Sequence, residues 1–196
     1  DIETSPNLGW VWGKWEQNVI EFEKDWYILC FAAKWLDKKG IMTSALPDFK
    51  KRYKKNNEDD YGVVKALWNL IDEADVIIAH LGVGRKVSTG GFSLWKGCMN
   101  GVKKSWRDMI KYNKQDVLLL EEIYLKLRSW MVNPPNMNVL NGTTHACPTC
   151  GYNHLQKRGW SVTRVNKYQR YQCAGIDGCG AWSTGERIKI DRVIIK

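Results

Sequence analysis

The chain has 196 residues, enough for one ordinary domain and a small appendage. With 44% hydrophobic residues and eleven tryptophans it can fill a packed core, and it contains no run of roughly 18 apolar residues that would span a membrane. The net charge of +9 is uneven: residues 141–196 hold nine Lys and Arg against three Asp and Glu, a balance of +6. Such a basic tail indicates either a polyanionic partner, usually nucleic acid, or a solubilising surface.

The first forty residues predict β-structure. DIETSP at 1–6 reads as a short strand that ends at a turn, and residues 7–37 are rich in aromatic and β-branched residues, which favour further strands. We expect these runs to pack as a meander in one sheet. Cys30 lies in an apolar run and is predicted to be a core thiol.

The middle of the chain predicts an α/β layer. The charge cluster KKRYKK at 50–55 is expected to be a solvated loop. Apolar residues recur at helical spacing within 59–75, and VIIAH at 76–80 reads as a short buried strand. Strands, a helix and another strand together indicate α/β architecture.

The second half predicts a long helical stretch and then a boundary. A glycine-rich segment reaches Gly91, residues 92–131 are mostly helical in pattern, and Cys98 on this stretch is expected in the core. Residues 133–145 lack hydrophobic periodicity and contain two prolines, which indicates a linker. We therefore predict domains at 1–132 and 146–196.

Four residues in the first domain could carry chemistry. Asp1 and Glu3 are two apart on a predicted strand and should point to one face, where neighbouring carboxylates need a cation. Tyr112 and Asp116 are four apart on a predicted helix, so they also share a face. Each pair by itself is more typical of exposed surface residues, but their combination and order are more specific.

The order of these motifs resembles the DEDDy type of 3′–5′ exonuclease in the RNase H-like superfamily. DIETSP resembles the first motif of that family, DVIIAH leads into the second, and YNKQD at 112–116 resembles the third. The chain is most similar to small exonuclease-like proteins of phages and bacteria that end in a zinc ribbon. The resemblance implies an RNase H-like mixed sheet flanked by helices and a cytoplasmic protein, in the host cell if a phage encodes it.

The resemblance also implies a two-metal mechanism. Phosphodiester hydrolysis in this superfamily uses two Mg²⁺ or Mn²⁺ ions about 4 Å apart. Asp1, Glu3 and Asp116 would hold the metals, and Tyr112 would orient the attacking water. His80 lies close to these residues by position, and we assign it no role.

One expected motif is incomplete. In the family, the strand ending in Ala-His continues with Asn and then a further aspartate, whereas Leu81 follows His80 here. We expect that residues are missing from this sequence at that junction and before Asp1, and an intact mass well above 22.7 kDa would support this. A true deletion would instead predict a crippled nuclease or an inactive binding protein.

Four cysteines in the tail predict a structural zinc site. The spacing Cys147-x₂-Cys150 and Cys173-x₅-Cys179 matches the two knuckles of a zinc ribbon, although the second gap is longer than usual. His145 or His154 could replace a cysteine, and a metal-free or disulfide form is the alternative. In so small a domain the metal would supply much of the folding energy.

Between the cysteine pairs, basic and aromatic residues alternate in a way that suits nucleic-acid binding. The same aromatics could equally cover a thin ribbon. The candidate contacts are Lys157, Arg158, Trp160, Arg164, Lys167, Tyr168 and Arg170.

The leading hypothesis is a metal-dependent 3′–5′ exonuclease acting on DNA or RNA, with a zinc ribbon that helps to bind the substrate. A catalytically impaired nucleic-acid-binding or assembly protein of the same fold is the second hypothesis, and an endonuclease or resolvase is the third. No motif for a protein partner is evident.

Overall fold

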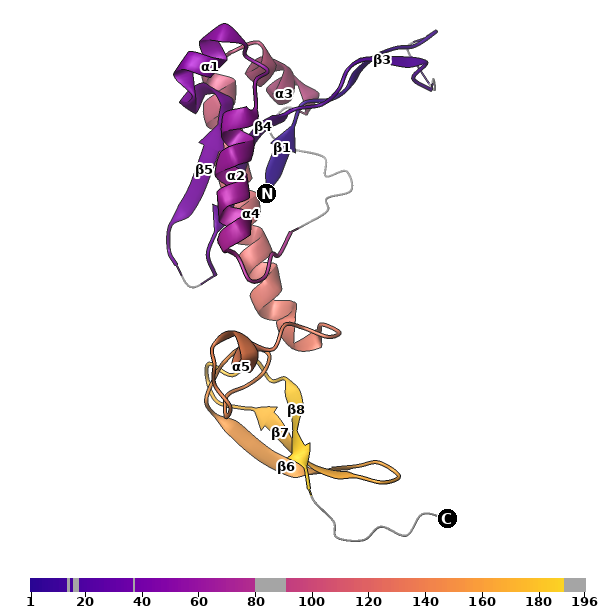
Figure 1. Cartoon of the computed structure of the whole chain (residues 1–196), viewed down its shortest axis with the longest axis vertical. Coiled ribbons are helices and arrows are strands. Elements are labelled where there is room, and N and C mark those ends of the chain that lie inside the picture. Colours follow the sequence, from indigo (N-terminus) through magenta and orange to yellow (C-terminus); the bar gives the residue numbers. More distant parts are fainter. Residues whose placement is uncertain (14, 16–17, 37, 80–90, 189–196) are drawn as a thin grey trace. The chain divides into compact units, whose positions relative to one another are not determined.

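A computed structural model of the protein describes residues 1–13, 15, 18–36, 38–79 and 91–188 (Figure 1). The chain divides into two compact units, Asp1–Glu121 and Glu122–Lys196. The division falls inside the long helix α4 (Lys103–Leu127). Each unit has its own hydrophobic core.

A three-stranded antiparallel sheet organises the first unit. Its order is β1 (Ile2–Thr4), β4 (Ile28–Lys34) and β5 (Ile41–Ala45), with β4 in the centre. Four successive residues of β4, 29–32, are buried, so both of its faces are covered. This explains why β4 reads as a continuous apolar run rather than an alternating one.

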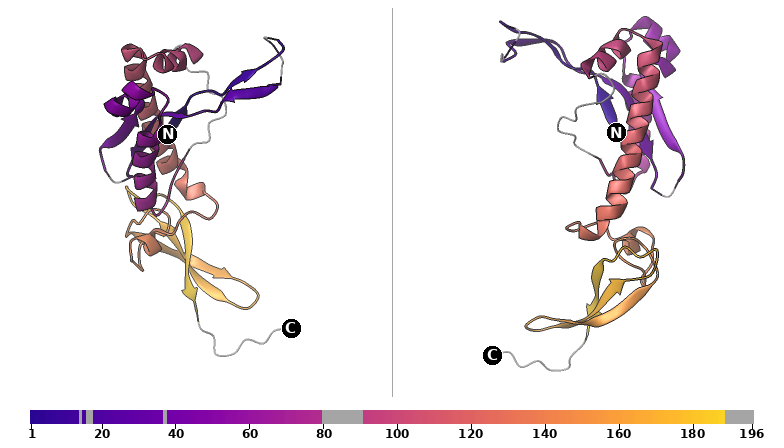
Figure 2. Two further views of the ribbon diagram at one scale, coloured as in Figure 1. Left: turned by 45° about the horizontal axis from the view of Figure 1, so that its top comes forward. Right: turned by 180° about the vertical axis from the view of Figure 1, so that it is seen from behind.

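Two further strands form a separate ribbon, which corrects the prediction of one continuous sheet. β2 (Leu8–Trp10) pairs with β3 (Glu21–Lys24) alone, and the ribbon extends away from β1 and β4 (Figures 1 and 2). Its apolar side chains are exposed: Trp10 by 63%, Trp12 by 85% and Trp15 by 75%. Aromatic residues favour strands, but their number did not distinguish a core strand from an exposed ribbon.

Helices account for most of the remaining first unit. The 3₁₀ turn η1 (Leu46–Asp48) leads into α1 (Lys50–Lys55), and α2 (Tyr61–Glu73), α3 (Phe92–Met99) and α4 follow. The helices expected within 59–75 and 92–131 are confirmed, whereas α1 replaces the loop expected at 50–55. Lys and Arg are good helix formers, and Tyr53 packs on the core, which together explain α1. No helix of the described ranges is long and apolar enough to cross a membrane.

The strand expected at VIIAH is not formed over its described residues. Residues 76–79 have no regular structure, and the side chains of Val76, Ile77 and Ile78 are 40–57% exposed. An apolar run becomes a strand only where a neighbouring strand completes its backbone hydrogen bonds. All five strand pairs of the described residues are antiparallel, and the fold is mixed α and β.

The core of the first unit brings β4, η1 and the helices together. Its largest fully buried side chains are Phe31, Leu29, Leu46, Met109 and Val63. Cys30 and Cys98 are fully buried, which confirms them as core thiols. Burial raises the pKa of the Cys98 thiol to about 12 and that of Cys30 further still, so both thiols are unreactive at neutral pH.

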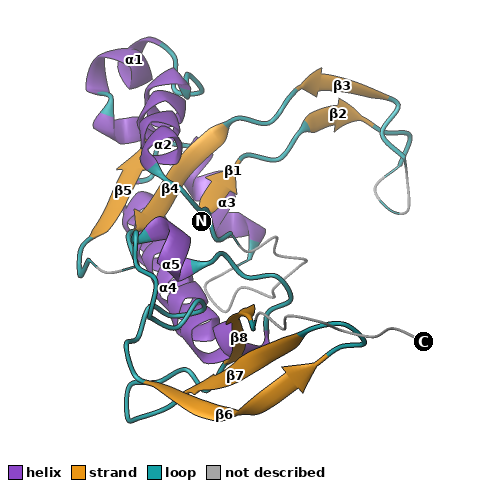
Figure 3. Cartoon of the chain, turned by 60° about the horizontal axis from the view of Figure 1, so that its bottom comes forward, coloured by secondary structure: helices purple, strands orange, loops and turns teal. Residues whose placement is uncertain are grey.

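The second unit contains a three-stranded antiparallel sheet (Figure 3). After the 3₁₀ turn η2 (Arg128–Trp130), the short helix α5 (Met137–Leu140) lies within the segment expected to be a linker, and Asn136 caps it. The sheet order is β6 (Leu155–Val162), β7 (Lys167–Cys173) and β8 (Trp182–Arg187). The hydrophobic core cluster of this unit is small and consists of Cys147, Cys173 and Ala181.

Candidate metal centres

Three carboxylates from distant parts of the sequence meet in the first unit. Asp1 and Glu3 come from the start of the chain and Asp116 from α4, and one carboxylate oxygen of each lies within 4.8 Å of the others. The chain therefore brings together the three acids that the sequence singled out.

The sheet fixes the first two of these acids. The backbone nitrogen of Asp1 donates to the Ala32 carbonyl (2.8 Å), and the Ala32 N–H donates back to the Asp1 carbonyl (2.9 Å). Glu3 lies opposite Cys30 in the β1–β4 ladder. Because successive strand residues alternate between faces, Asp1 and Glu3 share one face, as expected.

Helix α4 contributes a buried amide to this cluster in addition to the Asp116 carboxylate. Asn113, three residues before Asp116, is completely buried, and its Nδ2 donates to Asp1 Oδ2 (2.7 Å). Its Oδ1 is buried with no hydrogen-bond partner among the described residues. The Asn113 amide therefore positions Asp1, and it holds an unused oxygen acceptor next to the acid cluster.

Trp95 of α3 links Glu3 to Tyr112. Its side chain lies close enough to the Glu3 carboxyl to lower the pKa of that group, and its ring packs edge-on against Tyr112 with a centroid distance of 6.2 Å. Tyr112 shares a face of α4 with Asp116, as the four-residue spacing predicted. Neither Asn113 nor Trp95 was predicted, because their contacts depend on how the helices pack rather than on a local motif.

The Glu3 carboxyl has an altered pKa. Burial raises it above its ordinary value of 4.5, the Trp95 N–H opposes that effect, and the negative charge of Asp116 raises it again. Carboxylates placed this close together repel one another unless a cation lies between them. Their oxygens are the ligands that hard divalent cations such as Mg²⁺ and Mn²⁺ prefer, so the cluster could hold one.

A second cluster, in the other unit, consists of four cysteines. Their sulfurs all lie within 4.8 Å of one another, and the Cys147–Cys179 and Cys150–Cys173 distances are both 3.7 Å. Four sulfurs arranged tetrahedrally about 2.3 Å from one zinc ion would be about 3.8 Å apart. The cluster could therefore hold zinc, while His145 and His154 are exposed and outside it.

The two cysteine turns have the same construction despite their different lengths. The Cys147 N–H donates to the Tyr152 carbonyl (2.8 Å), and the Cys173 N–H donates to the Ala181 carbonyl (2.9 Å). In each turn the acceptor lies two residues beyond the second cysteine, and the residue between is a glycine with positive φ, +76° at Gly151 and +75° at Gly180. The five-residue gap of the second pair therefore leaves the ligand geometry unchanged.

The cysteine thiols differ in pKa. Burial raises the pKa of Cys173 to about 11 and raises that of Cys179 further. Burial acts in the same direction on Cys150, but the backbone N–H of Tyr152 and the neighbouring thiols outweigh it and lower the pKa of that thiol. Zinc needs thiolates, so binding must release protons from this cluster.

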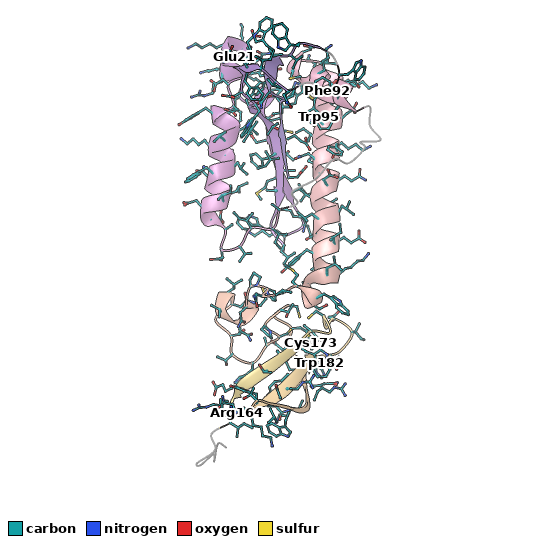
Figure 4. All side chains as sticks on the ribbon, turned by 90° about the vertical axis from the view of Figure 1, so that its right-hand side faces the viewer. Glu21, Phe92, Trp95, Arg164, Cys173 and Trp182 are labelled. Atoms are coloured by element: carbon teal, nitrogen blue, oxygen red, sulfur yellow. The ribbon has the colours of Figure 1, made fainter. Side chains whose placement is uncertain are left out.

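The seven predicted nucleic-acid contacts do not share one face of the β6–β7–β8 sheet. Trp160 lies opposite Gln169, which is on the same side of β7 as Lys167 and the metal-site residue Cys173. Tyr168 and Arg170 point to the other side of β7. Arg164 is in the turn between β6 and β7, at the far end of the hairpin from Cys173 (Figure 4). Lys157 borders a bulge in β6, and Arg158 lies within it.

Two contacts between a cation and an aromatic ring mark the two faces. Lys167 Nζ lies 4.4 Å from the centre of the Trp160 ring, and the Arg170 guanidinium lies 4.4 Å from that of Trp182. Trp182 and Arg187 of β8 were not among the predicted contacts, because they follow the second cysteine pair. The alternation of Trp182 with Thr184 along a strand was the signal that could have found Trp182, whereas Arg187 is paired with Tyr168 through a register shift that no sequence pattern shows.

Comparisons of the chain with protein-family models, with curated proteins and with solved structures found no match. His80 and its junction with Leu81 lie outside the described residues. The two clusters and the sheet of the second unit are therefore the features of the described residues that point to a function.

Proposed function

We propose that the protein is a metal-dependent 3′–5′ exonuclease in which the first unit has an RNase H-like fold and the second is a zinc ribbon. The observation that carries this proposal is the meeting of Asp1, Glu3 and Asp116, with one oxygen of each within 4.8 Å. A surface acid pair would not require a buried asparagine to hold it, as Asn113 holds Asp1.

Each residue of the cluster has a defined part in the proposed reaction. A pair of Mg²⁺ or Mn²⁺ ions would supply an activated water and stabilise the leaving 3′ oxygen. Asp1, Glu3 and Asp116 would be their ligands, and Glu3 would bind as the carboxylate, the form that burial disfavours. Tyr112, held against Trp95, would orient the attacking water.

The cysteine cluster has a structural part in this proposal. All four ligand positions are occupied by cysteine, which leaves no open position for catalysis. The zinc ribbon would hold DNA or RNA near the enzyme through basic and aromatic side chains, so binding would weaken steeply as salt is raised.

The proposal is tested with a 5′-labelled single strand and Mn²⁺. The wild-type protein should produce a ladder of shortening products, and Asp116→Ala should lose at least 10²-fold in rate because a metal ligand is removed. Asp108→Ala is the matched control, since Asp108 is exposed on the same helix and outside the cluster, and it should keep its activity. Release of internal fragments, or equal activity in Asp116→Ala, would contradict the proposal.

A second function is favoured by one observation. Among the residues that the structure describes, the cluster contains three acids rather than the four of the family that the sequence resembles. A nucleic-acid-binding protein without nuclease activity would fit three. Binding without cleavage by the wild-type protein in Mn²⁺ would select this alternative.

A further inference from the structure

We propose that the side of the β7–β8 sheet facing away from the cysteine cluster binds single-stranded nucleic acid, with Trp182 stacking on a base and Arg170 and Arg187 contacting phosphates. This inference deepens the proposed function and rests on its nucleic-acid-binding part. We call this side of the sheet the open face. It is defined by three cross-strand pairs: Tyr168–Arg187, Arg170–Thr184 and Gln172–Trp182.

The register separates the open face from the metal site. Cys173 alternates with Gln172 on β7, so its sulfur points to the opposite side, where it is buried in the cysteine cluster. Tyr171 also points to that side and covers Gly185, where an added Cβ would lie 2.9 Å from the Tyr171 ring. The side that carries the metal is therefore partly occupied by its own side chains.

The open face has the composition of a nucleic-acid surface. Its three pairs contain two arginines, two aromatic residues, a threonine and a glutamine, and they include neither an acid nor an aliphatic side chain. A face that merely covered a thin core would need aliphatic residues. Glu186 lies next to Arg187, in the register shift between the Tyr168 and Arg170 pairs, so the two arginines outnumber the one acid of β8, and this excess of positive charge complements a phosphate backbone.

Trp182 is the anchor because it is both exposed and held in place. The ring is 52% exposed although the guanidinium of Arg170 lies 4.4 Å from its centre. Arg170 is itself half-buried in the central strand, so it restricts the ring on one side while the residue remains largely accessible. A base stacked on this ring would place its phosphates near the donors of Arg170 and Arg187.

Stacking also selects single strands. The flat face of a base is accessible when the base is unpaired and is covered by its neighbours in a duplex. A duplex could still contact the two arginines, but it would gain nothing from Trp182.

The test uses the full, zinc-loaded chain with Asp116→Ala, so that binding is measured without cleavage. Fluorescence anisotropy follows the titration of labelled oligothymidylate and, separately, oligouridylate. Trp182→Ala should weaken binding by about tenfold or more, the loss expected of one stacked base. Trp130→Ala is the matched control: it removes a ring that is 84% exposed in the same unit but lies in η2, outside the sheet, so it should change affinity less than twofold.

Two further measurements separate stacking from misfolding. Trp182→Phe should restore most of the affinity, and the zinc content of every variant should stay equal to that of the parent. Equal losses in Trp130→Ala and Trp182→Ala, or a duplex bound as tightly as the single strand, would overturn the inference. Wild-type protein that binds through Trp182 without cleaving would reject the exonuclease and leave this inference standing, whereas cleavage with no effect of Trp182→Ala would do the reverse.

Discussion

Glu3 is the residue at which a functional demand should conflict most clearly with stability. Its folded-state pKa is raised above the ordinary value, first by burial and then by the charge of Asp116. A group with a raised pKa stabilises the fold below its unfolded pKa and loses that contribution as the pH rises through the folded pKa. At neutral pH without a metal, the Glu3 carboxylate therefore destabilises the protein.

We therefore expect Glu3→Gln to be more stable than wild type at pH 7 without divalent cations, with a Tm a few °C higher. The difference should shrink and then vanish as the pH falls below the ordinary pKa of 4.5, where the acid is protonated in both states. Mn²⁺ should make the wild type the more stable of the two proteins. The ion would stabilise the wild-type cluster, whereas the variant lacks one of its ligands. Thermal unfolding by calorimetry with and without Mn²⁺ measures this, and an unchanged order after Mn²⁺ addition would argue against a cation at Glu3.

The acids of the cluster could be predicted from the sequence, but the residues that position them could not. The two-residue period of a strand and the four-residue spacing of a helix are local rules, so Asp1 with Glu3 and Tyr112 with Asp116 could be assigned from the sequence. The roles of Asn113 and Trp95 exist only after α3 and α4 pack against β1. No local pattern encodes such contacts.

Among the elements, the second cysteine turn depends most visibly on backbone conformation. Gly180 has φ of +75° with no atom near the position of an added Cβ, so a substitution there would test conformation without a steric clash. An L-residue in the left-handed region costs roughly 1–2 kcal/mol, whereas asparagine tolerates that region better than alanine.

Gly180→Ala should therefore weaken zinc binding by about tenfold, as judged by competition with a chromogenic chelator. Gly180→Asn should lose clearly less. Equal affinity for all three proteins would mean that this turn does not need a left-handed residue to bind the metal.

The elements also show where sequence patterns were ambiguous. α2 and α4 carry apolar periodicity over several turns and were predicted, as were the cysteine turns. The run at 76–79 is as apolar as a buried strand but has no described partner, and α1 has the charge of a loop but the propensity of a helix. Short segments of this kind are decided by tertiary contacts, which local patterns do not contain.

For the whole molecule, the two separate cores predict two independent responses to metal removal. The four cysteines of the second unit should be protected from thiol reagents by zinc, whereas Cys30 and Cys98 are protected by burial in the first unit. Thiol titration should find about zero reactive groups in the zinc-loaded protein, four after chelation and six in denaturant. Exposure of all six on chelation alone would mean that the metal also stabilises the first core.

Zinc loading should depend on pH with a definite sign. The Cys173 thiol has a pKa of about 11 without metal because burial disfavours its thiolate, so zinc has to displace protons at neutral pH. The apparent affinity should rise as the pH is raised from 6 to 8 and fall as it is lowered. Calorimetric titration in buffers of different ionisation enthalpy would count the released protons, and a pH-independent affinity would contradict thiolate ligation.

The position of the tryptophans has a consequence for optical measurements. All eleven lie among the described residues and Trp106 alone is buried, while Trp10, Trp12 and Trp15 lie on or beside the exposed β2–β3 ribbon. Most of the indole emission of the native protein should thus be red-shifted and open to quenching by iodide. The total fluorescence will then change little when the chain unfolds. Iodide that quenches the emission of the exposed rings would leave the emission of Trp106 as a selective optical probe of the first core.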